Sequence, residues 1–107
     1  MEGELGLMII HVLEMGDLLP SLSASQTRAR QYLVGNPNIA SEMAKFDPRA
    51  ALYAPPRVLI YTTKSGTCIS YDLPSSVFGR LHCDDILKTA SDLDQKFEKL
   101  VLRALTT

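Results

Sequence analysis

The sequence predicts an α+β fold in two layers: a four-stranded, mainly antiparallel sheet with helices packed on one face. Three observations predict it: four runs of β-favouring residues, a glycine-containing turn between the last two runs, and a long amphipathic pattern at the C-terminal end. The chain has 107 residues. This is the size of one ordinary domain, so we expect residues 1–107 to form a single domain.

The first two strands are expected in the N-terminal third of the chain. Residues 7–13 form a short apolar run rich in β-branched side chains, and Pro20 lies beyond its end. Residues 21–26 are polar and rich in serine, which is typical of a surface loop. Residues 30–34 form the second β-favouring run.

A short helix is expected directly after the second strand. In Asn36-Pro37, asparagine caps free backbone N–H groups and the fixed φ of proline suits the first helical position. The pattern predicts a helix over residues 37–46, and Asp47-Pro48 predicts one more helical turn through Ala51. Residues 53–56 are expected to be extended, because two prolines exclude helix there.

The third and fourth strands form a predicted hairpin. Residues 57–63 and 67–72 are rich in β-favouring side chains and flank Lys64-Ser65-Gly66, a loop of hairpin length that contains glycine. The stretch from residue 73 to residue 82 reads as a loop. Because sequential strands usually lie side by side, we expect the strands to neighbour one another in chain order.

The C-terminal segment is predicted to be one long helix. Asp84 and Asp85 lie in its first turn and Arg103 in its last, as the helix dipole favours. Apolar side chains recur every three or four residues, and no polar residue interrupts the stripe, so we interpret it as core. The stripe consists of Ile86, Ala90, Leu93, Phe97, Leu100 and Ala104.

The composition excludes several classes of partner. Lys plus Arg number 11 and Asp plus Glu number 12, a net charge of −1, so we expect neither nucleic acid nor a membrane as partner. The acidic start Met1-Glu2-Gly3-Glu4 is unlike a secretory signal. Cys68 and Cys83 are too few for a disulfide framework. The expected location is therefore the cytoplasm.

One edge of the expected sheet carries a candidate site. If the strands alternate in direction, the end of the second, the start of the third and the end of the fourth meet there, beside the start of a helix. We expect a pocket for a small anionic or polar ligand at this edge; the alternative is that these residue types only serve the turns. The candidate residues are Gly35, Asn36, Pro37, Arg57, Asp72, Ser75 and Ser76.

His82-Cys83-Asp84-Asp85 is the other candidate cluster. A structural metal site needs a second close pair of ligands, which the sequence lacks, so we expect no metal. We expect no cofactor either, because the glycines are scattered singly and no phosphate-binding loop exists. Cys83 lies at a helix start, where the pKa of a thiol falls, so it is a candidate reactive thiol with His82 beside it. No other catalytic pattern is present.

Several separated blocks of the chain resemble family 302 of the domains of unknown function. The resemblance implies a fold like one repeat of the TATA-box-binding protein, and it implies no catalytic activity. In that family a strand and a helix usually precede the segment that matches residues 5–13, and the helix covers the sheet. The resemblance places residues 1–5 at the end of that helix, which leaves two alternatives: the chain is a fragment or has a mis-set start, or something else covers the sheet. The blocks are Tyr32-Leu33-Val34-Gly35-Asn36-Pro37, Ile39-Ala40 with Met43, Asp47-Pro48-Arg49-Ala50, Leu52-Tyr53-Ala54-Pro55, Arg57-Val58-Leu59-Ile60-Tyr61, Ile69-Ser70-Tyr71-Asp72 and Pro74-Ser75-Ser76.

An uncovered apolar face favours association, so we expect a symmetric homodimer. The leading hypothesis for function is a soluble, non-enzymatic module that self-associates and binds a small ligand or a protein partner. The first alternative is a small thiol-dependent enzyme or redox carrier that uses Cys83 and His82. The second is a purely structural interaction module, favoured if the strand-end edge lacks a pocket of roughly 300 Å³.

Overall fold

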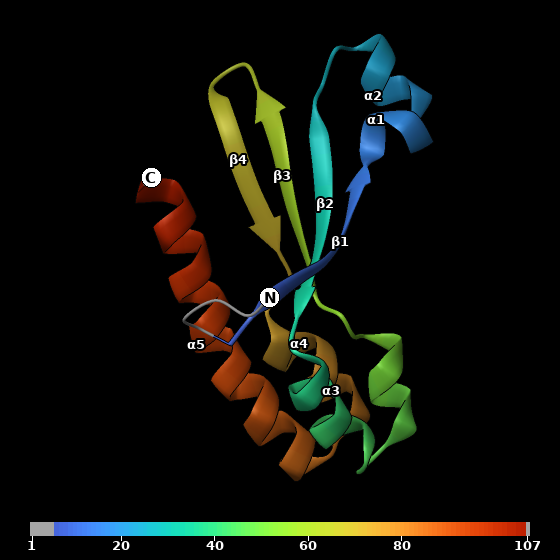
Figure 1. Cartoon of the computed structure of the whole chain (residues 1–107), viewed down its shortest axis with the longest axis vertical. Coiled ribbons are helices and arrows are strands. Elements are labelled where there is room, and N and C mark those ends of the chain that lie inside the picture. Colours follow the sequence, from blue (N-terminus) through green and yellow to red (C-terminus); the bar gives the residue numbers. More distant parts are fainter. Residues whose placement is uncertain (1–5, 107) are drawn as a thin grey trace.

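The sheet has four strands, each antiparallel to its neighbour, in chain order (Figure 1). They are β1 (Met8–Glu14), β2 (Ala29–Gly35), β3 (Arg57–Thr63) and β4 (Gly66–Tyr71). The computed structural model describes residues 6–106. It confirms the expected fold class and strand order. The segment 1–5, which the resemblance places at the end of a preceding helix, lies outside the described residues.

Two of the expected helix starts are confirmed. The helix α3 (Pro37–Ala44) begins after Asn36, whose side chain accepts a hydrogen bond of 2.9 Å from the Asn38 backbone N–H. The 3₁₀ turn η1 (Pro48–Leu52) begins after Asp47 with the same geometry. In both cases a short polar side chain satisfies an N–H group that the helix itself leaves free.

Two segments expected as loops are helical instead. Between β1 and β2 lie α1 (Met15–Leu18) and α2 (Pro20–Ala24), and after β4 lie α4 (Pro74–Phe78) and η2 (Gly79–Leu81). Both α2 and α4 have proline in the first turn, which costs no hydrogen bond there. Buried Phe78 and Leu81 then hold the second segment against the core.

The core lies at one end of the sheet, where α3, α4 and the first half of α5 (Asp84–Thr106) meet it (Figure 1). From α5, Ile86, Ala90, Leu93 and Phe97 are buried, which confirms the first part of the predicted stripe. Leu105, near the C-terminal end of α5, is 61% exposed. Phe97 is fully buried and Leu100 packs against the core, but beyond them the end of this helix leaves Leu102 and Leu105 exposed. Ala104, the last residue of the predicted stripe, is also exposed and does not belong to the core.

The strand β1 forms one edge of the sheet and is also poorly covered. Ile9 and Val12 point to the same face as their cross-strand partners, Val34 and Tyr32. Ile9 is 61% exposed and Val12 is 40% exposed, whereas Val34 is buried. Within residues 6–106, no helix has the length and apolar character needed to cross a membrane.

Candidate functional site

The end of β2, the start of β3 and the end of β4 meet at the end of the sheet that lies next to the core. The Val34 N–H of β2 donates a hydrogen bond of 2.9 Å to the Pro56 carbonyl, which joins the end of β2 to the residue before β3. A Cβ atom on Gly35 would lie 3.4 Å from Pro56 Cδ and 3.7 Å from Pro55 Cβ. The backbone of β2 therefore approaches the Pro55-Pro56 segment closely.

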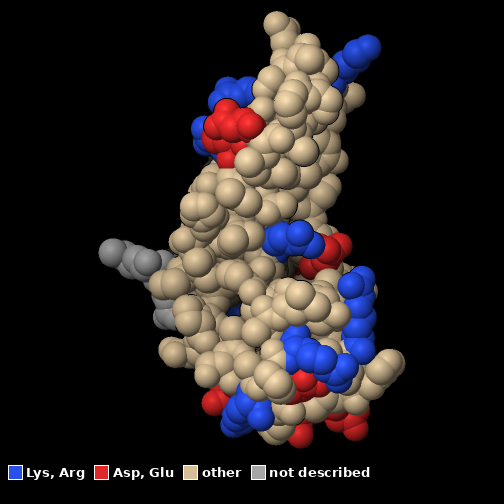
Figure 2. Space-filling model, turned by 90° about the vertical axis from the view of Figure 1, so that its right-hand side faces the viewer, with Lys and Arg blue, Asp and Glu red and all other residues tan. Residues whose placement is uncertain are grey.

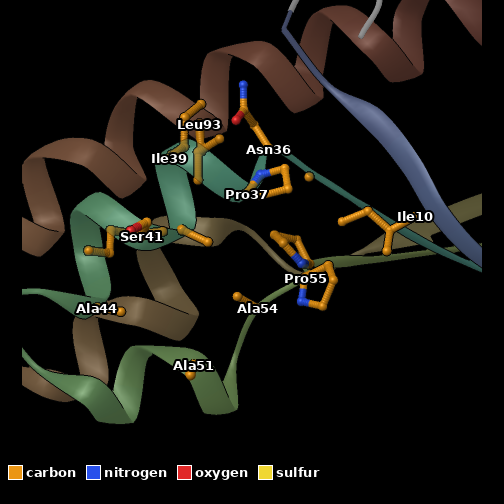
Figure 3. Close-up of a pocket in the computed structure, with 14 residues that line it drawn as sticks. Ile10, Asn36, Pro37, Ile39, Ser41, Ala44, Ala51, Ala54, Pro55 and Leu93 are labelled. Carbon is orange, nitrogen blue, oxygen red and sulfur yellow. The ribbon is translucent and has the colours of Figure 1, made fainter. Parts of the chain in front are cut away.

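An apolar cavity of about 330 Å³ lies between this end of the sheet, α3 and η1 (Figure 3). Gly35, Asn36 and Pro37 line it, so three of the expected site residues face one space. Ile10 from β1 and Leu93 from α5 close it on two sides, as the labelled side chains show. No pattern in the sequence predicted that Ala40, Ala44, Ala54 and Pro55 line the cavity, although Ala40 and Ala44 are one helical turn apart and share a face of α3.

The polar groups of the cavity are few. The Asn36 side chain accepts from the Asn38 N–H and donates to the Gly6 carbonyl at 2.9 Å, so both ends of its amide serve the local structure. Ser41 adds one hydroxyl. Among the described residues that line the cavity, none carries a titratable side chain. This lining suits an apolar molecule.

Arg57 and Asp72 lie in a neighbouring groove of about 500 Å³, on the other side of Pro55 and Pro56. We call it the arginine groove and define it by Tyr53, Arg57, Asp72, Pro74, Phe78 and Arg80. The Arg80 Cζ atom lies 5.8 Å from the centre of the Tyr53 ring, a cation–π distance. Tyr53 and Phe78 meet edge to face, with ring centres 5.9 Å apart.

Ser75 and Ser76 face neither space. The Ser75 backbone N–H donates a hydrogen bond of 2.9 Å to Asp94 Oδ1, and its hydroxyl donates to Asp94 Oδ2. These bonds fasten the start of α4 to α5. Ser76 is exposed. The expected seven-residue site is thus divided among a cavity, a groove and an interhelical contact.

Cys83 lies at the start of α5, outside the linings of the cavity and of the arginine groove. Its side chain is half-buried and packs against the core, and its carbonyl accepts a hydrogen bond of 2.9 Å from the Leu87 N–H. His82 beside it is exposed and has a left-handed φ of 52°. Within residues 6–106, no three His, Cys, Asp or Glu side chains are grouped as a metal would need.

One ion pair lies at the start of η1, whose residue Ala51 lines the cavity. The Arg49 guanidinium donates hydrogen bonds of 2.7 to 3.2 Å to the Asp47 carboxylate. These side-chain bonds, followed by the Arg49 backbone N–H, lower the pKa of Asp47 below its ordinary value. The charge of Arg49 is therefore largely neutralised.

The fold has a close relative among solved structures. The crystal structure of an uncharacterized conserved protein DUF302 from Bacillus stearothermophilus is similar to this chain, with a TM-score of 0.75 and 15% sequence identity. The similarity covers 88% of this chain and 74% of that chain. At this identity, the likeness shows the fold alone. No curated protein matches the chain.

The sequence itself matches one protein family along nearly all of its length. The family is described as the domain of unknown function DUF302, and the match spans residues 2–104. The family resemblance and the α+β fold expected from the sequence are therefore confirmed. Because the match covers far more than half of the chain, the chain belongs to the DUF302 family.

Proposed function

We propose that this chain is a non-enzymatic binding module that takes a small, mainly apolar molecule in the cavity beside α3. The observation that carries the proposal is the cavity itself, about 330 Å³ in volume and lined by side chains from β1, α3 and α5. Ligand sites are typically apolar hollows of at least roughly 300 Å³. The volume also argues against a purely structural interaction module.

The chemistry of the lining favours an apolar ligand over the anionic or polar one expected from the sequence. The amide of Asn36 is already hydrogen-bonded at both ends. Apart from Ser41, the remaining wall consists of proline rings, alanine methyl groups, Met43 and the aliphatic side chains of Ile10, Ile39 and Leu93. Such a surface gains free energy by excluding water, at roughly 25 cal/mol per Å² of apolar area.

Indole is a suitable probe, because it is small, uncharged and mainly apolar. We expect a titration followed by backbone amide NMR to move the signals of Gly35, Ala40 and Ala44. Ala44→Leu fills the cavity and should weaken indole binding at least tenfold. The matched control is Ala24→Leu at the exposed end of α2, which should bind indole like the wild type.

The proposal fails if indole moves no cavity signal at millimolar concentration, or if Ala44→Leu and Ala24→Leu bind it equally. Thermal melting of both variants shows that each is folded.

The rival thiol-dependent activity is tested by alkylation, since a reactive Cys83 would be modified much faster than an ordinary thiol. Cys68 and Cys83 are free thiols, which favours a reducing compartment such as the cytoplasm.

Self-association is a second candidate property, and the exposed edge of the sheet favours it. Ile9, Ile10 and Val12 of β1 are 61%, 44% and 40% exposed. An edge strand also presents unpaired backbone groups to a second chain. A symmetric dimer through β1 covers both features at once.

Sedimentation equilibrium tests the dimer. The wild type should dimerise at micromolar concentration, and Val12→Lys should shift it to monomer. Leu73→Lys is the matched control, because Leu73 is 51% exposed but follows β4, the opposite edge of the sheet. A monomeric wild type at high micromolar concentration would remove this candidate.

A further inference from the structure

The arginine groove has a rigid apolar floor. Pro74 and Phe78 are fully buried beneath it and support it from within the core, and the rings of Tyr53 and Phe78 meet edge to face. The Tyr53 N–H donates a hydrogen bond of 3.0 Å to the Ala50 carbonyl, which fixes the end of η1. Leu52 borders the groove and is 78% exposed. A flat apolar or aromatic molecule would find complementary surface there.

Two guanidinium groups border this floor. Arg57 is the exposed first residue of β3, and Arg80 lies in η2 between buried Phe78 and Leu81. Within residues 6–106, neither has a carboxylate at ion-pair distance. The ring of Tyr53 holds the Arg80 guanidinium from one side and leaves its N–H donors unused by an acid.

The charges of the groove do not cancel. Arg57 and Arg80 contribute two positive charges, and Asp72 is the one acidic residue in the described part of the lining. The nearby cation Arg49 is already paired with Asp47. In Figure 2, Lys and Arg side chains lie over the lower half of the face shown, with Asp and Glu side chains among them. The groove therefore has an excess of positive charge above an apolar floor.

We infer that the arginine groove binds a small carboxylate that carries an aromatic or aliphatic body. The body packs on the half-buried Tyr53 and the exposed Leu52, and the carboxylate accepts hydrogen bonds from Arg80 and Arg57. Arginine is suited to this task, because its planar group binds both oxygens of a carboxylate together. The site is separate from the cavity beside α3, since Pro55 and Pro56 form the wall between them.

The probe is 2-naphthoate, compared with 2-naphthamide, which has nearly the same shape and no charge. We expect 2-naphthoate to bind more tightly than the amide. Arg80→Gln and Arg57→Gln should each weaken 2-naphthoate about tenfold and leave 2-naphthamide unchanged, as the loss of a hydrogen bond to a charged group implies. Asp72→Asn should strengthen 2-naphthoate binding, because it removes the nearby negative charge.

The matched control is Arg28→Gln, which changes the net charge equally at an exposed residue outside the groove. Ala44→Leu, which fills the cavity, separates the two sites: retained 2-naphthoate binding in this variant, with loss in Arg80→Gln, supports the groove. The inference is overturned if 2-naphthoate does not bind, or if the amide binds as tightly. It is also overturned if Arg28→Gln weakens binding as much as Arg80→Gln, or if Ala44→Leu abolishes it. Melting temperatures equal to that of the wild type show that the variants are folded.

Discussion

Ser75 connects the start of α4 to the middle of α5. Its N–H and its hydroxyl both donate to the Asp94 carboxylate, across 19 residues of chain. The residues around it in α4, Pro74 and Phe78, are fully buried, so this contact closes one side of the core. Ser75→Ala removes the hydroxyl bond and keeps the backbone bond, which makes it a clean perturbation.

The expected loss follows from the chemistry of the bond. A hydrogen bond to a charged group contributes about 1.5–3 kcal/mol to stability. Asp94 is only partly buried, so water satisfies the freed oxygen in part and the lower end of this range applies. A loss of about 1.5 kcal/mol in the free energy of unfolding corresponds to a fall of roughly 7 °C in the melting temperature of a domain of this size.

Ser76→Ala is the control, because Ser76 is the exposed neighbour in the same helix. Calorimetry or circular dichroism should show a change below about 0.5 kcal/mol for this variant. Equal melting temperatures for the two variants would refute the role assigned to Ser75. Unchanged stability together with lost 2-naphthoate binding would instead restore Ser75 to the ligand-binding role expected from the sequence.

Three further outcomes are expected. Folding favours the charged form of Asp47, because hydrogen bonds from Arg49 lower its pKa; stability relative to Asp47→Asn is therefore full above about pH 4 and falls below it, as urea unfolding at several pH values will show. Phe97→Ala should cost about 3–5 kcal/mol in thermal unfolding because Phe97 is fully buried, whereas Leu105→Ala at an exposed position should cost under about 0.5 kcal/mol. Gly66→Ala should destabilise the hairpin by about 1 kcal/mol in the same assay, since Gly66 has a φ of 131° that other residues rarely adopt.

Periodic patterns predicted the elements that are long enough to show a period. The strands and α5 follow from alternating or helically spaced apolar residues, and Phe97 on the stripe is indeed buried. The helix α4 was wrongly expected to be a loop, because five residues are too short for a period. Its position depends on Asp94, which no local pattern around Ser75 reveals.

The place in the fold of the candidate site could be predicted from the sequence, but the chemistry of its lining could be predicted much less well. Alternating strand directions bring Gly35 and Arg57 to the same edge, as antiparallel pairing requires. The apolar lining came from residues with no individual signal, such as Ala44 in a short helix and Pro55 in an extended connection. The positive charge at the border of the arginine groove depends in part on Arg80. Arg80 lies in η2, a segment that we expected from the sequence to be a loop.

The position of the core at one end makes the two ends of each strand unequal. Val58, near the start of β3, is 5% exposed, whereas Thr63 at the other end of the strand is exposed. Amide hydrogens near Thr63 will exchange with solvent through local opening of the turn, while those near Val58 will require opening of the whole core. Exchange rates should therefore form a gradient along the sheet. The hairpin tip at the fast end is the place where a fluorophore or an affinity tag will disturb either candidate site least.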